Sequence, residues 1–467
     1  MRQQHAVRVL CTVLLLASLS RYFNPVSDVT ATAATMSQHG SVDEPADETP
    51  SWQVDGLTRD PCKAVGKVQF DGVAANSSVG WQVGLGSRTV GSNASAALRG
   101  SVLENLTEWG WNATESAHLV TFPNGSTEVA TNLVATLPAA ARLADDVSEV
   151  PRVVIAAHYD SRPTADMDPN ESRRSEPIPG ANDGASGVAV LLELGRVLPM
   201  ANLSVEIVLL FTDVEDHGEP LLFMGAQRWA DNLSQPEVVR TNAFVLLDMV
   251  GDGDLGIAAE PLNSDSGLMR LLLSMAAPFG AHATIPDCGG LPAIQPRVTS
   301  NDSLGIHDDH LVVKGMFPAA LLIDVSYGPP APTNSLGGYW HTHDDTPDKV
   351  SAESLGLVGG MVELALRSGL GEQRLPSDAR ASDQQAGSNG IGSDSDAGVD
   401  VAEPPHASRG LDIAITAALT AICLDVLIRR RRAVERARSR MSDDESGSPS
   451  AAEGSQDIDG QPAPEEE

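Results

Sequence analysis

Histidine and acidic side chains follow short apolar runs of the sequence, and together they have the chemistry of a metal site. In chain order they are His158 and Asp160 after residues 153–157, Asp213, Glu215 and Asp216 after residues 205–211, Asp248 after residues 244–247, and Asp324 after residues 319–323. Neutral imidazole and carboxylate oxygens are ligands that suit zinc or a related divalent ion. A bound ion of this kind polarises a carbonyl or lowers the pKa of a water molecule.

Two further segments add candidate ligands. Asp183 lies in the loop GANDG, where a helix is expected to begin, and His341 lies in the segment WHTHDD. A single histidine or acidic pair in such a place is more often structural or solvated than a ligand. The recurrence of these residue types directly after apolar runs favours a shared metal site.

Two short spacings assign different roles within this site. Glu215 and Asp216 are adjacent, so one carboxylate can bind the ion while the other transfers protons. Asp160 lies two residues after His158, from where it can hold the imidazole ring in place. The sequence therefore predicts a metal site with an acid/base group beside it.

The elements that must position these side chains alternate along the chain. Residues 95–109 and 188–198 have the pattern of helices. The fully apolar runs are typical of buried parallel strands, and their ranges are 153–157, 205–211, 244–247 and 319–323. This alternation predicts an α/β domain of three α/β/α layers with a mostly parallel central sheet. Ligands of such sheets bind at the carboxyl ends of the strands, where the candidate residues fall.

The charge of the chain excludes one class of partner. The 467 residues include 63 Asp and Glu against 31 Lys and Arg, which gives a net charge of −32. Because nucleic-acid binding needs a basic surface, we expect no nucleic-acid partner. Two explanations of the acidity stay open, an acidic surface suited to high salt and acidic tails.

The two ends of the chain carry apolar runs typical of export and membrane anchoring. Residues 1–33 have the pattern of a signal peptide, with an uncleaved anchor as the alternative. Residues 410–428 precede four arginines and predict a transmembrane helix, with an interfacial helix as the alternative. We therefore expect a single-pass protein of the cell membrane with its catalytic domain outside the cytoplasm, or alternatively a secreted protein.

The remaining segments divide into one globular domain and polar connections. Residues 34–60 and 373–409 are expected to be linkers, residues 61–372 the catalytic domain, and residues 429–467 a basic stop-transfer segment followed by an acidic disordered tail. Nine Asn-x-Ser/Thr glycosylation sequons lie between the two apolar runs, which supports export. They begin at Asn76, Asn93, Asn105, Asn112, Asn124, Asn170, Asn202, Asn232 and Asn301.

The cysteines exclude a thiolate zinc module, because the sequence contains no Cys-x-x-Cys pair. Cys11 and Cys423 lie in the terminal apolar runs. Cys62 and Cys288 lie in the globular part, and the sequence leaves open whether they form a disulfide.

Seven segments, in order, resemble one known family, the zinc-dependent exopeptidases that include aminopeptidases and glutaminyl-peptide cyclotransferases. The resemblance covers about residues 68–368. The segments are QVGLGSRTVGS from Gln82, AAHYDSRP from Ala156, PGANDGASGVAVLLEL from Pro179, DVEDHGE from Asp213, LLDMVG from Leu246, DDH from Asp308 and YWHTHDDTPDKVS from Tyr339. The resemblance implies a zinc exopeptidase fold of the phosphorylase/hydrolase-like type.

The resemblance also implies a role for each matching position. Asp183, Asp216 and His341 would bind the primary zinc ion. His158 and Asp248 would bind a second ion in the two-metal peptidases, with Asp183 as the bridge, whereas one zinc ion suffices in the cyclotransferases. Glu215 would be the general acid/base in both. Asp308 would join a hydrogen-bond network beside the zinc, and Trp340 would form a wall of the substrate pocket.

Smaller features of the sequence favour one branch of this family. The doubled aspartate Asp308-Asp309 and the aspartate ligand Asp216 are similar to bacterial glutaminyl cyclases. One departure is Leu321, which stands where a histidine or aspartate is expected, and Asp324 is the candidate to replace it.

We therefore expect conversion of the N-terminal glutamine of peptides or proteins to pyroglutamate with release of ammonia, using one zinc ion or two. The alternative is a two-metal aminopeptidase that removes N-terminal residues. A third hypothesis, a non-catalytic ectodomain on the same fold, is disfavoured because all the expected ligands and the acid/base group are present.

Overall fold

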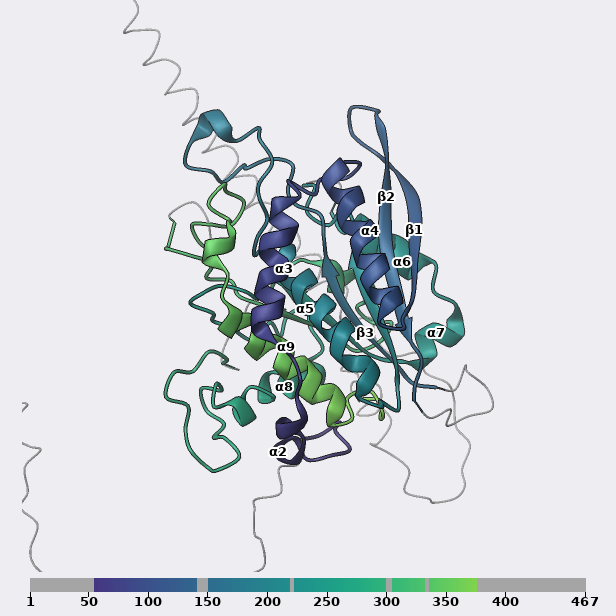
Figure 1. Ribbon diagram of the computed structural model, residues 1–467, viewed down its shortest axis with the longest axis vertical. Coiled ribbons are helices and arrows are strands. Elements are labelled where there is room, and N and C mark those ends of the chain that lie inside the picture. Colours follow the sequence, from purple (N-terminus) through teal and green to yellow (C-terminus); the bar gives the residue numbers. More distant parts are fainter. Residues whose placement is uncertain (1–53, 141–149, 219–221, 300–304, 332–335, 376–467) are drawn as a thin grey trace, which may run out of the picture. The chain divides into compact units, whose positions relative to one another are not determined.

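The computed structural model describes residues 54–375 except 141–149, 219–221, 300–304 and 332–335 (Figure 1). Its centre is a six-stranded sheet with the order β1-β2-β4-β3-β5-β6. The parallel strands are β3 (Arg152–His158), β4 (Glu206–Thr212), β5 (Thr241–Asp248) and β6 (Ala319–Ile323). An antiparallel hairpin, β1 (Asn112–Thr121) and β2 (Thr127–Leu137), extends the sheet beyond β4. The mostly parallel α/β sheet is confirmed, and the hairpin is an addition that the sequence pattern did not predict.

The parallel strands are buried on both faces, which explains their continuous apolar sequences. Every residue of β3 and β4 is buried. Because successive side chains of a strand point to opposite faces, Val153 and Ile155 enter one apolar core while Val154 and Ala156 enter another. The sheet therefore separates two cores.

One core lies under a layer of long helices. These are α3 (Gly72–Gly84), α4 (Asn93–Glu108), α5 (Ala185–Val197), α8 (Ser266–Ser274) and α9 (Ala352–Arg367). Figure 1 shows α3, α5 and α9 side by side over the sheet, and all of α5 except Arg196 is buried. Most of these helices begin at a side chain that caps their first N–H groups, such as Asp71 before α3 and Ser351 before α9. The predicted helices 95–109 and 188–198 correspond to α4 and α5.

Shorter helices cover the other core. They are α6 (Met224–Asp231) and α7 (Gln235–Arg240). Trp229 of α6 packs on Phe244 of β5 with ring centroids 5.8 Å apart, and Phe317 lies beside both rings. Helices thus lie on both faces of the sheet, as the three-layer prediction requires.

The cysteine pairing that the sequence left open is present. Cys62 of the short helix α2 (Pro61–Ala64) and Cys288 form a disulfide with a Cα–Cα distance of 5.6 Å. The bond joins positions 226 residues apart in the sequence. It therefore fastens the start of the described domain to the loop that follows α8.

The predicted terminal membrane segments lie outside the described residues. Those segments are the signal peptide at 1–33 and the transmembrane helix at 410–428. Within the described part of the chain, no helix combines the length and the apolar character needed to cross a bilayer.

Candidate metal centre

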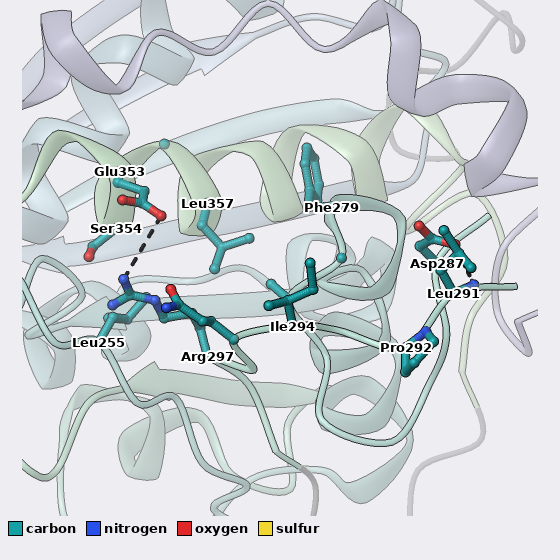
Figure 2. A pocket seen from close by; sticks show the side chains of 14 residues that line it. Leu255, Phe279, Asp287, Leu291, Pro292, Ile294, Arg297, Glu353, Ser354 and Leu357 are labelled. Carbon is teal, nitrogen blue, oxygen red and sulfur yellow. Dashed lines mark hydrogen bonds and ion pairs between the residues drawn. The ribbon is translucent and has the colours of Figure 1, made fainter. Parts of the chain in front are cut away.

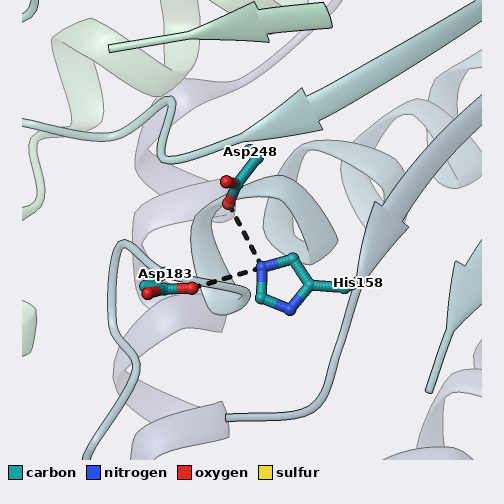
Figure 3. Close-up of side chains that lie close together, drawn as sticks. All are labelled: His158, Asp183 and Asp248. Carbon is teal, nitrogen blue, oxygen red and sulfur yellow. Dashed lines mark hydrogen bonds and ion pairs between the residues drawn. The ribbon is translucent and has the colours of Figure 1, made fainter. Parts of the chain in front are cut away.

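Two ligand sets meet at the carboxyl ends of the parallel strands. His158, Asp183 and Asp248 form one set, and Asp183, Asp216 and His341 form the other; within each set the ligand atoms lie within 4.8 Å of one another. Figure 3 shows the first set, in which Nε2 of His158 lies 3.2 Å from Oδ1 of Asp248 and 3.3 Å from Oδ1 of Asp183. The structure therefore brings together all five predicted ligands, with Asp183 common to both sets.

The second set is buried and has oxygen atoms without protein partners. Nε2 of His341 lies 3.3 Å from Oδ1 of Asp216 and 3.6 Å from Oδ2 of Asp183. Among the described residues, Oδ2 of Asp183 and Oδ2 of Asp216 are buried without a hydrogen-bond partner. A buried carboxylate oxygen is costly unless a partner compensates it. Both oxygens therefore fit a site that holds a cation.

The pKa values of the two histidines reflect the excess of negative charge at this site. Burial alone would lower the pKa of His341, but Asp216 and Asp166 raise it to about 9. Burial likewise opposes protonation of His158, yet Asp160, Asp183 and Asp248 raise its pKa well above the ordinary value. Carboxylates that draw protons onto both imidazoles provide the field that a divalent cation needs, and nitrogen with carboxylate oxygen is a ligand set that suits zinc.

The backbone next to several site residues adopts a rare conformation. Val214 has φ 57°, Met249 has φ 47° and His341 has φ 58°. These values lie in the left-handed region, which is unfavourable for side chains other than glycine, above all for a β-branched one. Val214 precedes Glu215 and Met249 follows Asp248, so the strain falls where the chain turns to present these carboxylates.

The loop that carries Asp183 is held by a carboxylate that the sequence reasoning missed. Asp345 accepts the backbone N–H groups of Asn182 at 2.8 Å and Asp183 at 3.2 Å. Tyr327 donates its hydroxyl to Asp345 at 2.6 Å. Burial, followed by the charge of Asp183, raises the pKa of Asp345 to about 7. Its place in the segment WHTHDD, four residues after His341, is the signal that could have pointed to it.

A buried arginine, Arg88, ties two site loops together. Its guanidinium donates to the carbonyls of Tyr159 at 3.1 Å, Pro179 at 2.8 Å and Gly180 at 2.6 Å. Burial lowers its pKa to about 10. Sequence reasoning assigned no role to this residue, although it lies within the segment QVGLGSRTVGS.

Asp160 has the position predicted for it and a further contact. Its Oδ1 lies 3.6 Å from Nδ1 of His158, an ion-pair distance that is too long for a hydrogen bond. Its two oxygens also accept the backbone N–H groups of Glu215 and Asp216, each at 3.2 Å. One buried carboxylate therefore connects the loop after β3 to the loop after β4.

The predicted acid/base residues share a cavity of about 240 Å³ with the metal ligands. Glu215, Asp308 and Trp340 line it. Burial and neighbouring carboxylates raise the pKa of Glu215 and of Asp308 well above their ordinary values. The Trp340 ring stacks on His341 with centroids 3.5 Å apart. The cavity thus combines protonatable carboxyl groups and one aromatic wall beside the metal centre.

Two other acidic candidates, Asp324 and Asp213, lie outside both ligand sets. The suggestion that Asp324 replaces the residue at Leu321 is wrong, because Asp324 accepts backbone N–H groups of Gly256 at 2.7 Å and Ser326 at 2.8 Å. Leu321 itself is buried in the apolar core beneath α6. Asp213 accepts the N–H of Thr131 at 2.9 Å and belongs to neither ligand set.

A second, larger cavity lies away from the metal centre. Its volume is about 800 Å³, and Figure 2 shows it between α9 and the loop that follows α8. Leu357, Phe279 and Ile294 line its apolar part, and Arg297 approaches Glu353 at 3.8 Å on one side. Neither ligand set contributes to its lining, whereas four of the five candidate ligands line the smaller cavity.

Comparison with known proteins supports this reading of the site. The family model of Peptidase family M28 matches residues 132–365, half of the chain. Aminopeptidase YwaD of Bacillus subtilis is 26% identical over 225 residues, which are 48% of this chain and 42% of that protein. The chain thus spans less than half the length of this curated relative.

Solved structures match a larger share of this chain than the curated relative does. A glutaminyl cyclase of Tannerella forsythia has a TM-score of 0.54 and 26% identity, with 64% of this chain and 98% of that chain covered. A Zn-dependent exopeptidase from Parabacteroides distasonis has a TM-score of 0.53 and 26% identity over the same shares. The ligand geometry, the fold and the family match agree, and the chain belongs to peptidase family M28.

Proposed function

We propose that this protein is a zinc-dependent glutaminyl-peptide cyclotransferase, which converts an N-terminal glutamine to pyroglutamate and releases ammonia. The observation that carries the proposal is the placement of Asp308. It lines the cavity of Glu215 and Trp340, and its Oδ2 is buried without a hydrogen-bond partner among the described residues. Similarity to the glutaminyl cyclase of Tannerella forsythia supports the same branch.

Zinc is the metal that the family and its Zn-dependent exopeptidase neighbour imply. Asp183, Asp216 and His341 would hold the first ion, and His158 with Asp248 would complete a second site that shares Asp183. The chemistry that zinc supplies when bound is polarisation of a carbonyl or activation of a water molecule.

The protein groups would carry the proton in cyclisation. The α-amine nitrogen bonds to the carbon of the γ-carboxamide, and the bond from that carbon to the amide nitrogen breaks. Glu215 takes a proton from the attacking amine and returns it to the leaving ammonia. Asp308 steadies this transfer, and Trp340 packs against the glutamine side chain.

An aminopeptidase is the second candidate, and the first ligand set favours it. His158 and Asp248 are placed with Asp183 as a second metal site requires, and Aminopeptidase YwaD is a sequence relative. In that reaction Glu215 would take a proton from a water molecule that attacks the first peptide bond. Metal stoichiometry and product identity separate the two reactions.

The test uses the full chain loaded with zinc at low and at high salt. One peptide begins with glutamine and a matched peptide begins with leucine, and mass spectrometry follows both. Loss of one ammonia from the glutamine peptide alone is the expected result. Release of whole N-terminal residues would replace the proposal by the aminopeptidase, and no change in either peptide would contradict both reactions.

We also propose that the catalytic domain lies outside the cytoplasm, held by the segment 410–428. The disulfide Cys62–Cys288 supports an oxidising compartment. Every sequon asparagine in the described residues is at least partly accessible to solvent. A mass decrease on glycosidase treatment, with the domain in the membrane fraction and open to external protease, is expected; a domain protected from external protease would overturn this placement.

A further inference from the structure

A paired arginine and aspartate lie against the second ligand set. Arg162 donates from Nε to Oδ1 of Asp166 at 2.8 Å and from Nη2 to Oδ2 at 2.9 Å. Its remaining nitrogen, Nη1, donates to Oδ1 of Asp216 at 2.6 Å. Arg162 is also mostly buried, with 13% of its side chain exposed. A two-point contact of this kind fixes the plane of the guanidinium, so Arg162 approaches Asp216 in one defined orientation.

The same aspartate also faces the histidine ligand. Oδ1 of Asp166 lies 3.3 Å from Nδ1 of His341, within ion-pair distance, although no hydrogen bond joins the two atoms and Nδ1 has no other hydrogen-bond partner among the described residues. The other nitrogen of that ring, Nε2, faces Asp183 and Asp216. The negative charge of Asp166 so close to Nδ1 favours the tautomer that carries its proton there, which leaves the lone pair of Nε2 for a metal.

From these contacts we propose that Arg162 and Asp166 are positioning residues that set two of the three ligands of one metal site before the ion binds. Asp166 orients His341. Arg162 occupies Oδ1 of Asp216 and leaves Oδ2, the oxygen without a protein partner, for the ion. The inference rests on the zinc site of the proposed function and not on which reaction that site performs.

The contacts of Arg162 are directed mainly at the two aspartates. Each of its guanidinium nitrogens already donates to Asp166 or Asp216. A guanidinium has five N–H donors, so Nη2 keeps one that these contacts do not use, and the contacts fix the orientation of Arg162 without occupying every donor.

The test measures zinc affinity of the full chain by competition with a chromophoric chelator. We expect Asp166→Asn and Arg162→Gln each to weaken zinc binding by about 10–100-fold. The matched controls are Glu171→Gln, on the same loop with 84% of its side chain exposed, and Arg297→Gln, which lines the other cavity. Both controls should stay within about twofold of the unchanged protein, because neither residue contacts a ligand.

Two further measurements separate positioning from general stability. Arg162→Lys keeps the charge but loses the planar fork, so its zinc affinity should fall as well. The visible absorption spectrum of the cobalt-loaded protein should change in Arg162→Gln and Asp166→Asn but not in the controls, because it reports the geometry of the ligands. If a glutamine or asparagine variant fails to fold, the same two measurements are made on Arg162→Lys and Asp166→Glu. Zinc affinity should fall in the lysine variant. It should stay near that of the unchanged protein in the glutamate variant, which keeps the carboxylate.

Zinc affinity and cobalt spectra unchanged in Arg162→Gln, Arg162→Lys and Asp166→Asn would overturn the inference. That result is distinguishable from failure of the proposed function. An unchanged protein that binds zinc but makes no pyroglutamate contradicts the function and leaves the positioning test intact. A protein that makes pyroglutamate while its Arg162 and Asp166 variants bind zinc normally contradicts only the positioning.

Discussion

Oδ1 of Asp183 lies 3.3 Å from Nε2 of His158, and the other oxygen of the same carboxylate faces the second ligand set. This carboxylate is therefore common to both sets, whereas Asp248 belongs to one. Asp183→Asn should abolish tight zinc binding, whereas Asp248→Asn should keep one zinc ion per chain. Metal analysis after exhaustive dialysis checks this, and wild-type zinc content in Asp183→Asn would contradict the shared site.

Glu215 should matter for turnover but not for metal retention. It lines the cavity beside the ligands and belongs to neither ligand set. Glu215→Gln keeps the shape of the side chain and removes its ability to accept a proton, so the rate should fall by about 10²–10⁴-fold. Glu171→Gln, the same chemical change on an exposed side chain, should leave the rate unaltered. Full activity of Glu215→Gln with normal zinc content would remove Glu215 from the mechanism.

The disulfide should stabilise the domain without affecting the metal. Cys62 and Cys288 belong to neither ligand set, and their bond closes a span of 226 residues. Replacing both by serine should lower the free energy of unfolding by about 2–4 kcal/mol, and zinc affinity should stay within about twofold. Denaturant unfolding of the variant and of the oxidised parent measures the difference, and equal midpoints would show that the bond contributes nothing.

Buried carboxyl groups should make the metal-free protein less stable as the pH rises. Burial raises the pKa of Asp309 from 3.8 to about 7, although Thr212 donates its hydroxyl to it. The folded chain then keeps a proton that the unfolded chain releases. The stability that this proton provides is complete below pH 3.8 and is lost as the pH rises through about 7.

Replacement of Asp309 isolates its share of this effect. Between these two pKa values, Asp309→Asn should reduce the slope of unfolding free energy against pH by up to about 1.4 kcal/mol per pH unit. Asp213 and Asp345, whose pKa values are also raised to about 7, retain their own contributions. Urea unfolding in the presence of chelator at several pH values gives the comparison. Parallel curves for the variant and its parent would show that Asp309 is ionised in the folded protein.

The sequence predicted the central strands because burial on both faces leaves an unbroken apolar run, as in β3 and β4. It did not predict the hairpin of β1 and β2, because β1 is largely exposed and Val120 is its one fully buried residue. The Asn124-Gly125 pair between these strands is a turn signal that could have pointed to the hairpin.

The metal ligands were predictable because each ends an apolar strand, closely follows one or lies in a segment that resembles the family. The groups that hold those ligands in position could not be predicted from the sequence. Arg162 meets Asp216, and Asp345 meets the loop of Asp183, only after distant segments fold together. Asp324 was misassigned for the same reason, since its place after β6 could not show that backbone N–H groups occupy both its oxygens.

Arg88 shows that the working unit of the protein begins before the residues that the family model matches. That region begins at residue 132, yet the three carbonyls that Arg88 binds belong to the loops of the metal centre. A fragment limited to residues 132–365 would expose these carbonyls in the interior with nothing to replace the guanidinium. The segment before residue 132 is therefore an internal scaffold for the metal loops, and a fragment cut to the family match would lose part of what holds the site in shape.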